Sequence, residues 1–465
     1  MGQPLIISVS GMRGIIGENL TPAIAAEYGC AFGSHLKRRV QRGDRRPLVC
    51  VGRDSRVSGP MVASAVMAGL CAVGVDAVDL GLVTTPGVGI MLRELGCDGG
   101  VMITASHNPI PYNGIKLLLD NGMAPPPETA AQIRQDYFDR QFDFVSSPEC
   151  GKVTANAETD RIHTEKVLAV VEARRIADRS YKIVLDSVNG AGAPVAKRLL
   201  AALGCEVVAI NDEPTGLFAH EPEPTAANLG GLCDRVRQEK ADVGFAQDPD
   251  ADRLALVDEN GVYIGEEYTL ALAAKQAYST SSGLAAANLS TSRMIDDVAK
   301  AAGGQVVRTP VGEANVAKAM LDNGCVIGGE GNGGVIDLRV GPIRDSLVAM
   351  ALVLQLMAES GKSISQLVAE IGGYSMHKDK FTADADEAGR IIDLAKAKYA
   401  HARVNTSDGC RFDFDDAWVH LRSSNTEPVM RVIVEADDES VARRYLDEVS
   451  EIRMAVLGQT SGQQQ

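Results

Sequence analysis

The stretch from residue 181 to residue 210 constrains the fold more strongly than any other part of this sequence. It contains an apolar strand, YKIVLD, then a turn and a helix, and after Gly204 a second apolar strand, CEVVAI. This order favours two parallel strands joined by a helix that covers their sheet. Another strand, ADVGFAQ, follows and leads directly into the acidic sequence DPDADR. The sequence therefore predicts an α/β unit with polar residues where a strand ends.

The rest of the chain divides into further units. A length of 465 residues suggests about three domains, and four are compatible with it. The N-terminal region contains a predicted strand over residues 5–9, a loop over residues 10–19, and a helix that Thr21 caps. The last region combines strands, a hairpin and helices in an α+β pattern. We expect the domains to span residues 1–155, 156–258, 259–370 and 371–465.

Charge and apolar patterning exclude several kinds of partner. The net charge is −15, whereas nucleic-acid-binding proteins are usually basic, so no nucleic-acid partner is expected. The N-terminus lacks a signal sequence, and the longest apolar run, residues 347–358, is too short to cross a bilayer. Nine cysteines are scattered without a C-x-x-C pair, which is typical of reduced thiols. These features predict a cytoplasmic protein with no membrane partner.

A serine follows one of the buried-looking strands. The sequence GGVMITA leads into Ser106, His107, Asn108 and Pro109. Because α/β folds bind ligands at the carboxyl ends of strands, Ser106 is a candidate nucleophile or phosphoryl acceptor. The Asn-Pro pair takes the chain out of regular structure and exposes the hydroxyl. Taken alone, the stretch fits a polar loop with capping side chains better.

The acidic sequence at residues 248–253 indicates a metal site more specifically. Asp248, Asp250 and Asp252 alternate along a predicted extended segment, so their carboxylates share one side. Such an oxygen-only set suits Mg²⁺, which commonly binds carboxylates together with a substrate phosphate. A calcium EF-hand loop is the alternative, and the spacing of Glu259 fits it. However, Arg253 stands where that loop needs glycine, and strands rather than helices flank it.

Two later stretches contain groups that suit a sugar phosphate. Residues 328–334, GGEGNGG, offer Glu330 and Asn332 as hydrogen-bonding groups for hydroxyls. Residues 422–428, RSSNTEP, together with Arg431, offer guanidinium groups and hydroxyls that suit phosphate. Each stretch alone is also compatible with a structural turn.

Two isolated cations are less informative. Arg13 lies in SGMRG, a mixture of residues similar to that of the phosphate-type loop at residues 422–428. Lys116 lies in the apolar strand GIKLLL, where a single lysine usually lies at an edge or faces outward.

In this order, the motifs resemble those of the α-D-phosphohexomutase family, which includes phosphoglucosamine mutase and phosphomannomutase/phosphoglucomutase. The resemblance extends over nearly the whole chain, and TASHNP and DPDADR are its most specific parts. It implies three related α/β domains with mixed sheets and a smaller C-terminal α+β domain around a central cleft. It also implies an isomerase that moves a phosphoryl group between two hexose hydroxyls through a phosphoserine and a hexose 1,6-bisphosphate intermediate.

The family's functional residues correspond to positions in this chain. The resemblance makes Ser106 the phosphoserine, whose phosphate completes a Mg²⁺ site formed by Asp248, Asp250 and Asp252. The implied catalytic residues are Ser106, Lys116, Arg13 and His107, with Lys116 the candidate general acid/base. Arg253, which follows the metal motif, is expected to steady it. The implied substrate-binding residues are Arg253, Thr309, Gly312, Glu330, Asn332, Arg422, Ser424, Asn425, Thr426 and Arg431.

The chain departs from the common family pattern in two loops. Many relatives have GExSGH at the sugar loop, so Asn332 replaces serine and Gly334 replaces a histidine sometimes given an acid/base role. Many phosphoglucosamine mutases have SGTEP at the phosphate loop, where Asn425 stands here. The first departure leaves the second proton-transfer residue unassigned.

The preferred sugar and the partners follow from the same comparison. The loop at residues 308–312, RTPVG, resembles that of the glucosamine group, so glucosamine phosphate is the expected substrate, with phosphomannomutase/phosphoglucomutase activity as the alternative. A phosphatase and a non-catalytic protein that binds a metal or a sugar phosphate are more distant alternatives. The expected partner is a small hexose phosphate, and the chain is expected to be a monomer or a homodimer.

Overall fold

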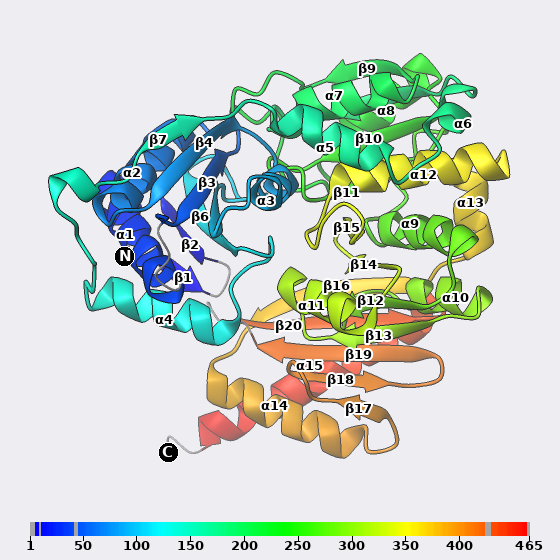
Figure 1. Ribbon diagram of the computed structural model, residues 1–465. Helices are drawn as coiled ribbons and strands as arrows, with labels where there is room; N and C mark the ends of the chain where they lie inside the picture. The colour runs from blue at the N-terminus through cyan, green and yellow to red at the C-terminus, as the bar shows by residue number, and fades with distance from the viewer. Residues whose placement is uncertain (1–4, 9–10, 41–44, 424–428, 463–465) are drawn as a thin grey trace.

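The computed structural model describes residues 5–8, 11–40, 45–423 and 429–462. Within these residues the strands form separate sheets, each accompanied by helices, and the chain completes one sheet before it starts the next (Figure 1). The first and second lie side by side in the upper part of the view, the third lies below the second, and the fourth lies at the bottom. The predicted fold class, three mixed α/β domains and a smaller C-terminal α+β domain, is confirmed.

The first sheet has the strand order β1-β2-β6-β5-β3-β4-β7, with β3 parallel to both β4 and β5. Its centre is fully buried, as the apolar sequences of β3 and β5 require. The expected loop over residues 10–19 is wrong in part, because residues 11–15 form β2, which pairs with β6. The elements are β1 (Ile6–Ser8), β2 (Gly11–Ile15), α1 (Pro22–Arg39), β3 (Leu48–Arg53), α2 (Gly59–Ala72), β4 (Asp76–Leu82), α3 (Thr85–Glu94), β5 (Gly99–Ile103), β6 (Tyr112–Leu119), α4 (Pro127–Phe138) and β7 (Val153–Ala155).

The second sheet contains the predicted βαβ unit. Strands β8 and β9 are parallel, α7 connects them, and β10 is parallel to β8 on the other side. Strand β11 returns antiparallel to β10, so the acidic sequence forms the turn between two buried strands. The elements are α5 (Thr159–Leu168), α6 (Ala173–Ala177), β8 (Lys182–Asp186), α7 (Gly192–Ala202), β9 (Glu206–Ile210), α8 (Gly230–Glu239), β10 (Val243–Gln247) and β11 (Leu254–Val257).

The third sheet repeats this arrangement. Strand β12 is parallel to β13 and β14, and β15 is antiparallel to β14, so the glycine-rich sequence forms a tight turn between β14 and β15. The elements are α9 (Glu267–Thr280), β12 (Leu284–Asn288), α10 (Met294–Ala301), β13 (Gln305–Thr309), α11 (Glu313–Asn323), β14 (Ile327–Glu330), β15 (Gly334–Ile336), α12 (Ser346–Ser360) and α13 (Ile364–Ile371).

The fourth sheet is antiparallel throughout, in the order β16-β20-β19-β18-β17. Helices α14 and α15 pack together and bury its apolar face. The elements are β16 (Ser375–Thr382), α14 (Ala385–Lys398), β17 (Arg403–Asn405), β18 (Cys410–Asp413), β19 (Ala417–Ser423), β20 (Val429–Ala436) and α15 (Glu439–Gly462). The domain boundaries given above stay a prediction.

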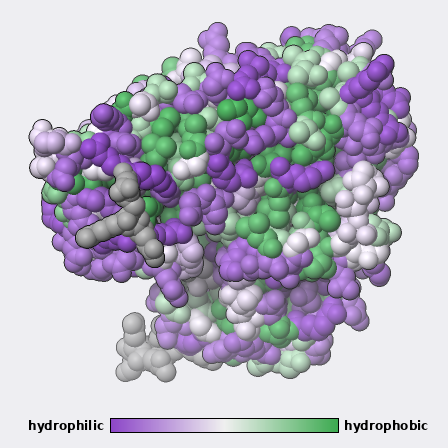
Figure 2. All heavy atoms as spheres, in the orientation of Figure 1, coloured by the Kyte–Doolittle hydropathy of each residue, from purple (hydrophilic) through white to green (hydrophobic). Residues whose placement is uncertain are grey.

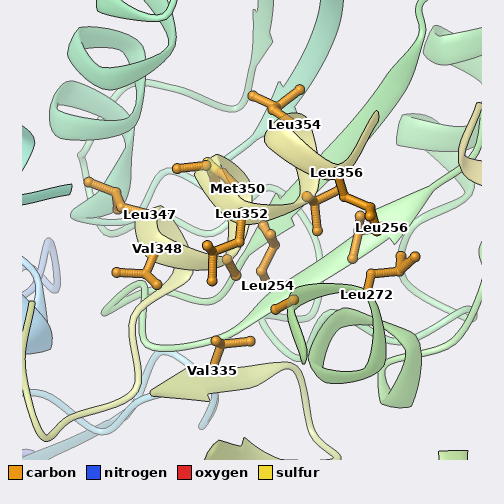
Figure 3. Packing of buried hydrophobic residues seen from close by; sticks show 14 of the residues in the cluster. Leu254, Leu256, Leu272, Val335, Leu347, Val348, Met350, Leu352, Leu354 and Leu356 are labelled. Atoms are coloured by element: carbon orange, nitrogen blue, oxygen red, sulfur yellow. The ribbon is translucent and has the colours of Figure 1, made fainter. Parts of the chain in front are cut away.

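Helix α12 joins the second and third sheets in one hydrophobic core. It is buried along nearly its whole length and packs against α9, β11 and β15. Figure 3 shows Val348 and Leu352 of this helix on the side toward Leu254 of β11 and Val335 of β15. On the face shown in Figure 2, hydrophilic residues are interspersed with smaller groups of apolar ones.

In the part of the chain that the structure describes, no single helix is long and apolar enough to cross a membrane. Helices α12 and α13 are long and apolar enough only when taken together, and they are bent by 90° relative to each other.

Candidate active site

Ser106 lies at the carboxyl end of β5 in an unusual backbone conformation. Its φ angle is 50°, in the left-handed region, which is uncommon for residues other than glycine. Its backbone N–H donates to Thr104 Oγ1 at 2.8 Å. The Ser106 hydroxyl donates to Asp248 Oδ2 at 3.0 Å and lies 3.2 Å from His107 Nδ1. The structure thus brings the candidate phosphoryl acceptor to the metal motif of the second sheet.

Arg56 fixes the loop that contains Ser106. Its guanidinium is buried, lies over the ring of Phe218, and pairs with Asp54, which also accepts a hydrogen bond from Thr104. Its remaining N–H groups donate at 2.6–3.0 Å to four carbonyl oxygens of the loop, those of Ser106, Asn108, Pro109 and Tyr112. These charge-assisted bonds preorganise the backbone around the serine. Sequence reasoning missed this role, although an Asp-x-Arg pair directly after an apolar strand was a usable signal.

Asp248, Asp250 and Asp252 form a buried carboxylate cluster. All three are fully buried, and one oxygen of each lies within 4.8 Å of the others. Burial and the two neighbouring carboxylates raise the pKa of Asp248. Asp250 Oδ1 and Asp252 Oδ1 have no hydrogen-bond partner among the described residues. Unpaired buried oxygens are costly, so this donor set fits a hard divalent cation such as Mg²⁺. The structure places these candidate ligands together, as predicted, but on a turn in which Ala251 has a φ of 55° and not on the predicted extended segment.

Lys116 points into this cluster. Its Nζ donates to Asp250 Oδ2 at 2.7 Å and lies 3.5 Å from Asp252 Oδ2. Burial would raise the pKa of Asp250, but the Lys116 ammonium and a hydrogen bond from Thr85 lower it. The edge or outward-facing position usual for such a lysine is wrong here, because β6 lies between β2 and β5. The carboxylates of the second sheet explain an ionised side chain on an interior strand.

Arg13 and His107 lie beside the same loop. Arg13, on β2, donates to Asn108 Oδ1 at 2.9 Å and thereby contacts the Ser106 loop. Burial, with the positive charges of Arg253 and Arg13, lowers the pKa of His107 to about 2, so its ring is neutral. Arg253 donates its backbone N–H to Asp248 Oδ1 at 3.1 Å, and its Nε lies 3.9 Å from Asp252. This agrees with its expected steadying position.

The sugar-loop candidates lie together in the third sheet. Glu330 is buried at the end of β14, and its Oε1 accepts hydrogen bonds from Asn288 at 2.7 Å and from the Gly312 N–H at 3.2 Å. Thr309 donates to a neighbouring carbonyl and is buried at the end of β13. Asn332 Oδ1 is buried, and no hydrogen bond reaches it from any described residue. Gly312 thus contacts Glu330, the turn after Glu330 contains Asn332, and Thr309 ends β13 of the same sheet.

Arg344 connects this turn to the carboxylate cluster and was missed in the sequence. Its Nη2 donates to Asp252 at 2.5 Å and its Nη1 to Glu330 at 2.7 Å. The only local signal was an arginine next to Asp345, which caps the apolar helix α12. Its partners lie 92 and 14 residues away in the sequence, so no short motif indicated the contact.

The candidate phosphate clamp lies on the fourth sheet. Arg422 and Arg431 are directly opposite each other on β19 and β20. Arg422 Nε donates to Asp408, whose other oxygen accepts the N–H of Val311 at 2.9 Å. Arg431 is exposed. Three other predicted clamp residues lie outside the described residues: Ser424, Asn425 and Thr426.

Comparisons with known proteins agree with this arrangement. Four models of the phosphoglucomutase/phosphomannomutase family match consecutive parts of the chain: α/β/α domain I at residues 5–144, domain II at 161–261, domain III at 265–374, and the C-terminal domain at 378–452. A curated phosphoglucomutase/phosphomannomutase from Thermococcus kodakarensis is 40% identical over 442 residues, which cover 94% of this chain and 96% of the relative. A probable phosphoglucosamine mutase from Methanopyrus kandleri is 38% identical and covers 95% of this chain and 96% of the relative.

A solved structure is also similar along the whole chain. The phosphoglucomutase/phosphomannomutase family protein from Burkholderia thailandensis superimposes with a TM-score of 0.86 at 28% identity, covering 97% of each chain. The chain therefore belongs to the α-D-phosphohexomutase family, whose members among the relatives above are named both phosphoglucomutase/phosphomannomutase and phosphoglucosamine mutase. The predicted enzyme class, a mutase among the isomerases, is confirmed by this membership.

Proposed function

We propose that this enzyme interconverts glucosamine 6-phosphate and glucosamine 1-phosphate through a phosphorylated Ser106. The main support is the contact between the Ser106 hydroxyl and Asp248, at 3.0 Å, in a carboxylate cluster that has two unpaired buried oxygens. A hard divalent cation would satisfy these oxygens, and a phosphate oxygen on Ser106 could complete the coordination of that cation.

The proposed reaction consists of two phosphoryl transfers. In the first, the bond between phosphorus and Ser106 Oγ breaks as the free hydroxyl of a hexose monophosphate bonds to that phosphorus; the hydroxyl loses its proton and Ser106 Oγ gains one. The resulting bisphosphate turns over. In the second, the bond between the sugar oxygen and its other phosphorus breaks as Ser106 Oγ loses its proton and bonds to that phosphorus, and the freed sugar oxygen takes up a proton. Mg²⁺, held by Asp248, Asp250 and Asp252, would neutralise charge on the phosphoryl oxygens.

The chain's own side chains orient this transfer. Arg13 and Lys116 lie on adjacent strands beside the Ser106 loop and place positive charge near the phosphoryl group. Lys116 is the candidate proton-transfer residue, because its Nζ lies at the carboxylate cluster that Ser106 contacts. Arg422 and Arg431 are proposed to bind the phosphate that is not reacting, whichever end of the sugar it occupies.

The choice of glucosamine is supported by the loop at residues 308–312 and by the carboxylates near it. Gly312 N–H is bonded to Glu330, and the next residue, Glu313, is a second carboxylate at this turn. A carboxylate favours an amino group over a hydroxyl at carbon 2 of the sugar. The relative from Methanopyrus kandleri has the glucosamine name, whereas that from Thermococcus kodakarensis has the glucose and mannose names. Phosphomannomutase/phosphoglucomutase activity is therefore the second candidate.

The test is kcat/KM for glucosamine, glucose and mannose 1-phosphates, each with Mg²⁺ and the matching 1,6-bisphosphate. Glucosamine phosphate is expected to give the highest value. An advantage of tenfold or more for glucose or mannose phosphate, about 1.4 kcal/mol in the transition state, would transfer the assignment to the second candidate. Release of inorganic phosphate and free sugar without any hexose 6-phosphate would indicate a phosphatase, and the absence of both reactions would indicate a binding protein.

A further inference from the structure

Arg344 occupies the space that a side chain at position 334 would need, at the turn between β14 and β15. A Cβ atom added to Gly334 would lie 2.2 Å from Arg344 Cδ and 2.9 Å from Arg344 Cγ, closer than real Cβ contacts. The aliphatic part of Arg344 thus fills the space that a side chain at position 334 would need. This is the position where the resemblance to relatives leads one to expect a histidine.

The Arg344 guanidinium is the cation shared by three acidic groups. It bonds Asp252 and Glu330, its Nε lies 3.7 Å from Glu313 Oε2, and its backbone N–H donates to Glu313 Oε1 at 2.6 Å. Arg344 is only 8% exposed, so its contacts lie in a region from which water is largely excluded. Removing one partner from such a buried group leaves the others uncompensated.

The backbone of Arg344 is also fixed. The next residue, Asp345, accepts the N–H groups of Leu347 and Val348 at the start of α12. Its other oxygen bonds His163 Nε2 at 2.6 Å, and both side chains are buried. The guanidinium therefore projects from an anchored helix start, which gives it one defined position between the two loops.

We propose that Arg344 is a positioning residue. It occupies the space that a side chain at position 334 would need, and from there it fixes the metal-loop carboxylate Asp252 and the sugar-loop carboxylate Glu330 in one geometry. The inference rests on the proposed roles of these two carboxylates. A guanidinium stays protonated, so this corner of the site contributes a fixed charge and a two-pronged hydrogen-bond donor rather than an exchangeable proton.

A double-mutant cycle tests the inference. Arg344→Ala is expected to lower kcat/KM about 10- to 100-fold, mainly through kcat, as the loss of a group that orients a metal ligand does. Gly334→Ala is expected to lower it about tenfold by displacing Arg344. The double variant is expected to be no worse than Arg344→Ala alone, because the displaced side chain is then absent. Additive losses in the double variant would overturn the shared-volume argument.

Two further measurements separate positioning from structural support. Mn²⁺ affinity, measured by calorimetry, is expected to fall in Arg344→Ala, because Asp252 is no longer fixed in its geometry. The loss of kcat is expected to persist at saturating Mn²⁺, because Glu330 is released as well. Full recovery of kcat at saturating Mn²⁺ would show that Arg344 only maintains the metal loop, and would overturn the proposal.

Arg344→Lys is the conservative control, and it keeps the test valid if the alanine variant does not fold. A lysine keeps the charge but cannot reach both carboxylates with a fixed fork, so only partial recovery of kcat is expected. Full activity with lysine would contradict the proposed geometry. The cycle uses whichever hexose 1-phosphate the native enzyme converts fastest. Its result can therefore be interpreted even if glucosamine is not the preferred sugar.

Discussion

The transfer corner, formed by Ser106, the three aspartates and Lys116, differs sharply from the phosphate clamp on the fourth sheet. The three aspartates are fully buried and are held by contacts between the first, second and third sheets. Arg422 is paired with Asp408, which is its one ion pair among the described residues, and Arg431 opposite it is exposed. The difference is what the proposed reaction requires. The corner must fix the reacting atoms, whereas the clamp must bind and release a phosphate that arrives in two orientations.

The largest expected effect comes from removing the hydroxyl at the transfer corner. Ser106→Ala should lower kcat on the order of 10³-fold or more, because the phosphoryl acceptor is lost. The coupled mutase assay measures this, and intact-mass analysis should find no phosphate on the variant. Because Ser106 has a φ of 50°, Ser106→Gly is the matched control that relieves the backbone conformation without restoring a hydroxyl. Recovery of activity in the glycine variant would falsify the role of Ser106.

Asp250→Asn is expected to have the next largest effect. It removes one charge that faces Lys116 and Thr85 and, in the proposed site, one ligand of Mg²⁺. We expect kcat to fall about 10²-fold and the Mg²⁺ concentration for half-maximal activity to rise. Asp258→Asn is a suitable control, since Asp258 is a buried aspartate of the same sheet whose hydrogen bonds are confined to its own turn. Native activity that stays unchanged in EDTA would exclude the metal role.

At the clamp, Arg422→Ala should change mainly KM, whereas the two variants above change mainly kcat. Loss of one charge-assisted phosphate contact costs about 2–3 kcal/mol, so KM should rise tens of fold with kcat changed much less. Arg403→Ala, an exposed arginine on the same sheet, should leave KM unchanged. A fall in kcat with an unaltered KM would remove the contrast between the two regions.

The smallest expected effect is on the pH dependence of the unfolding free energy, through a contact between α9 and the fourth sheet. Glu267 is buried and accepts hydrogen bonds from Ser292 N–H and from Lys378 on β16. Burial raises its pKa to about 7, although Lys378 lowers it. The folded state thus keeps a proton that the unfolded state has lost between about pH 4.5 and pH 7, so the free energy of unfolding falls as pH rises through this window.

Glu267→Gln should abolish this part of the pH dependence. Relative to the native protein, the variant should gain on the order of 1–2 kcal/mol in unfolding free energy from pH 5 to pH 8. Urea unfolding at both pH values measures the gain. Glu266→Gln removes the other carboxylate that contacts Lys378 and should keep the native slope. Equal slopes in all three proteins would contradict the titration of Glu267.

Local patterns predicted much of this structure, and contacts distant in sequence account for what they missed. The alternation of Asp248, Asp250 and Asp252 correctly indicated that their oxygens lie together, but the expected extended segment is wrong, because these residues form a turn in which Ala251 has a φ of 55°. Strand β2 was missed because its glycine-containing sequence lacks apolar alternation, and only its pairing with β6 makes it a strand. Arg56 and Arg344 were missed because their partners are up to 56 and 92 residues away. A sequence pattern indicates which groups are available, but not which ones the fold brings together.

The contact between Thr85 and Asp250 has a consequence for how the enzyme matures. Thr85 donates its backbone N–H to the Asp250 carbonyl at 3.0 Å and its hydroxyl to the Asp250 carboxylate at 2.5 Å. During synthesis, the Ser106 loop can fold with its own domain before residue 250 has been added to the chain. Ser106 meets the three aspartates only after the second unit has docked on the first. If the proposed divalent ion binds there, it would stabilise the docked pair over each separate unit, so metal supply would favour correct assembly of the growing chain.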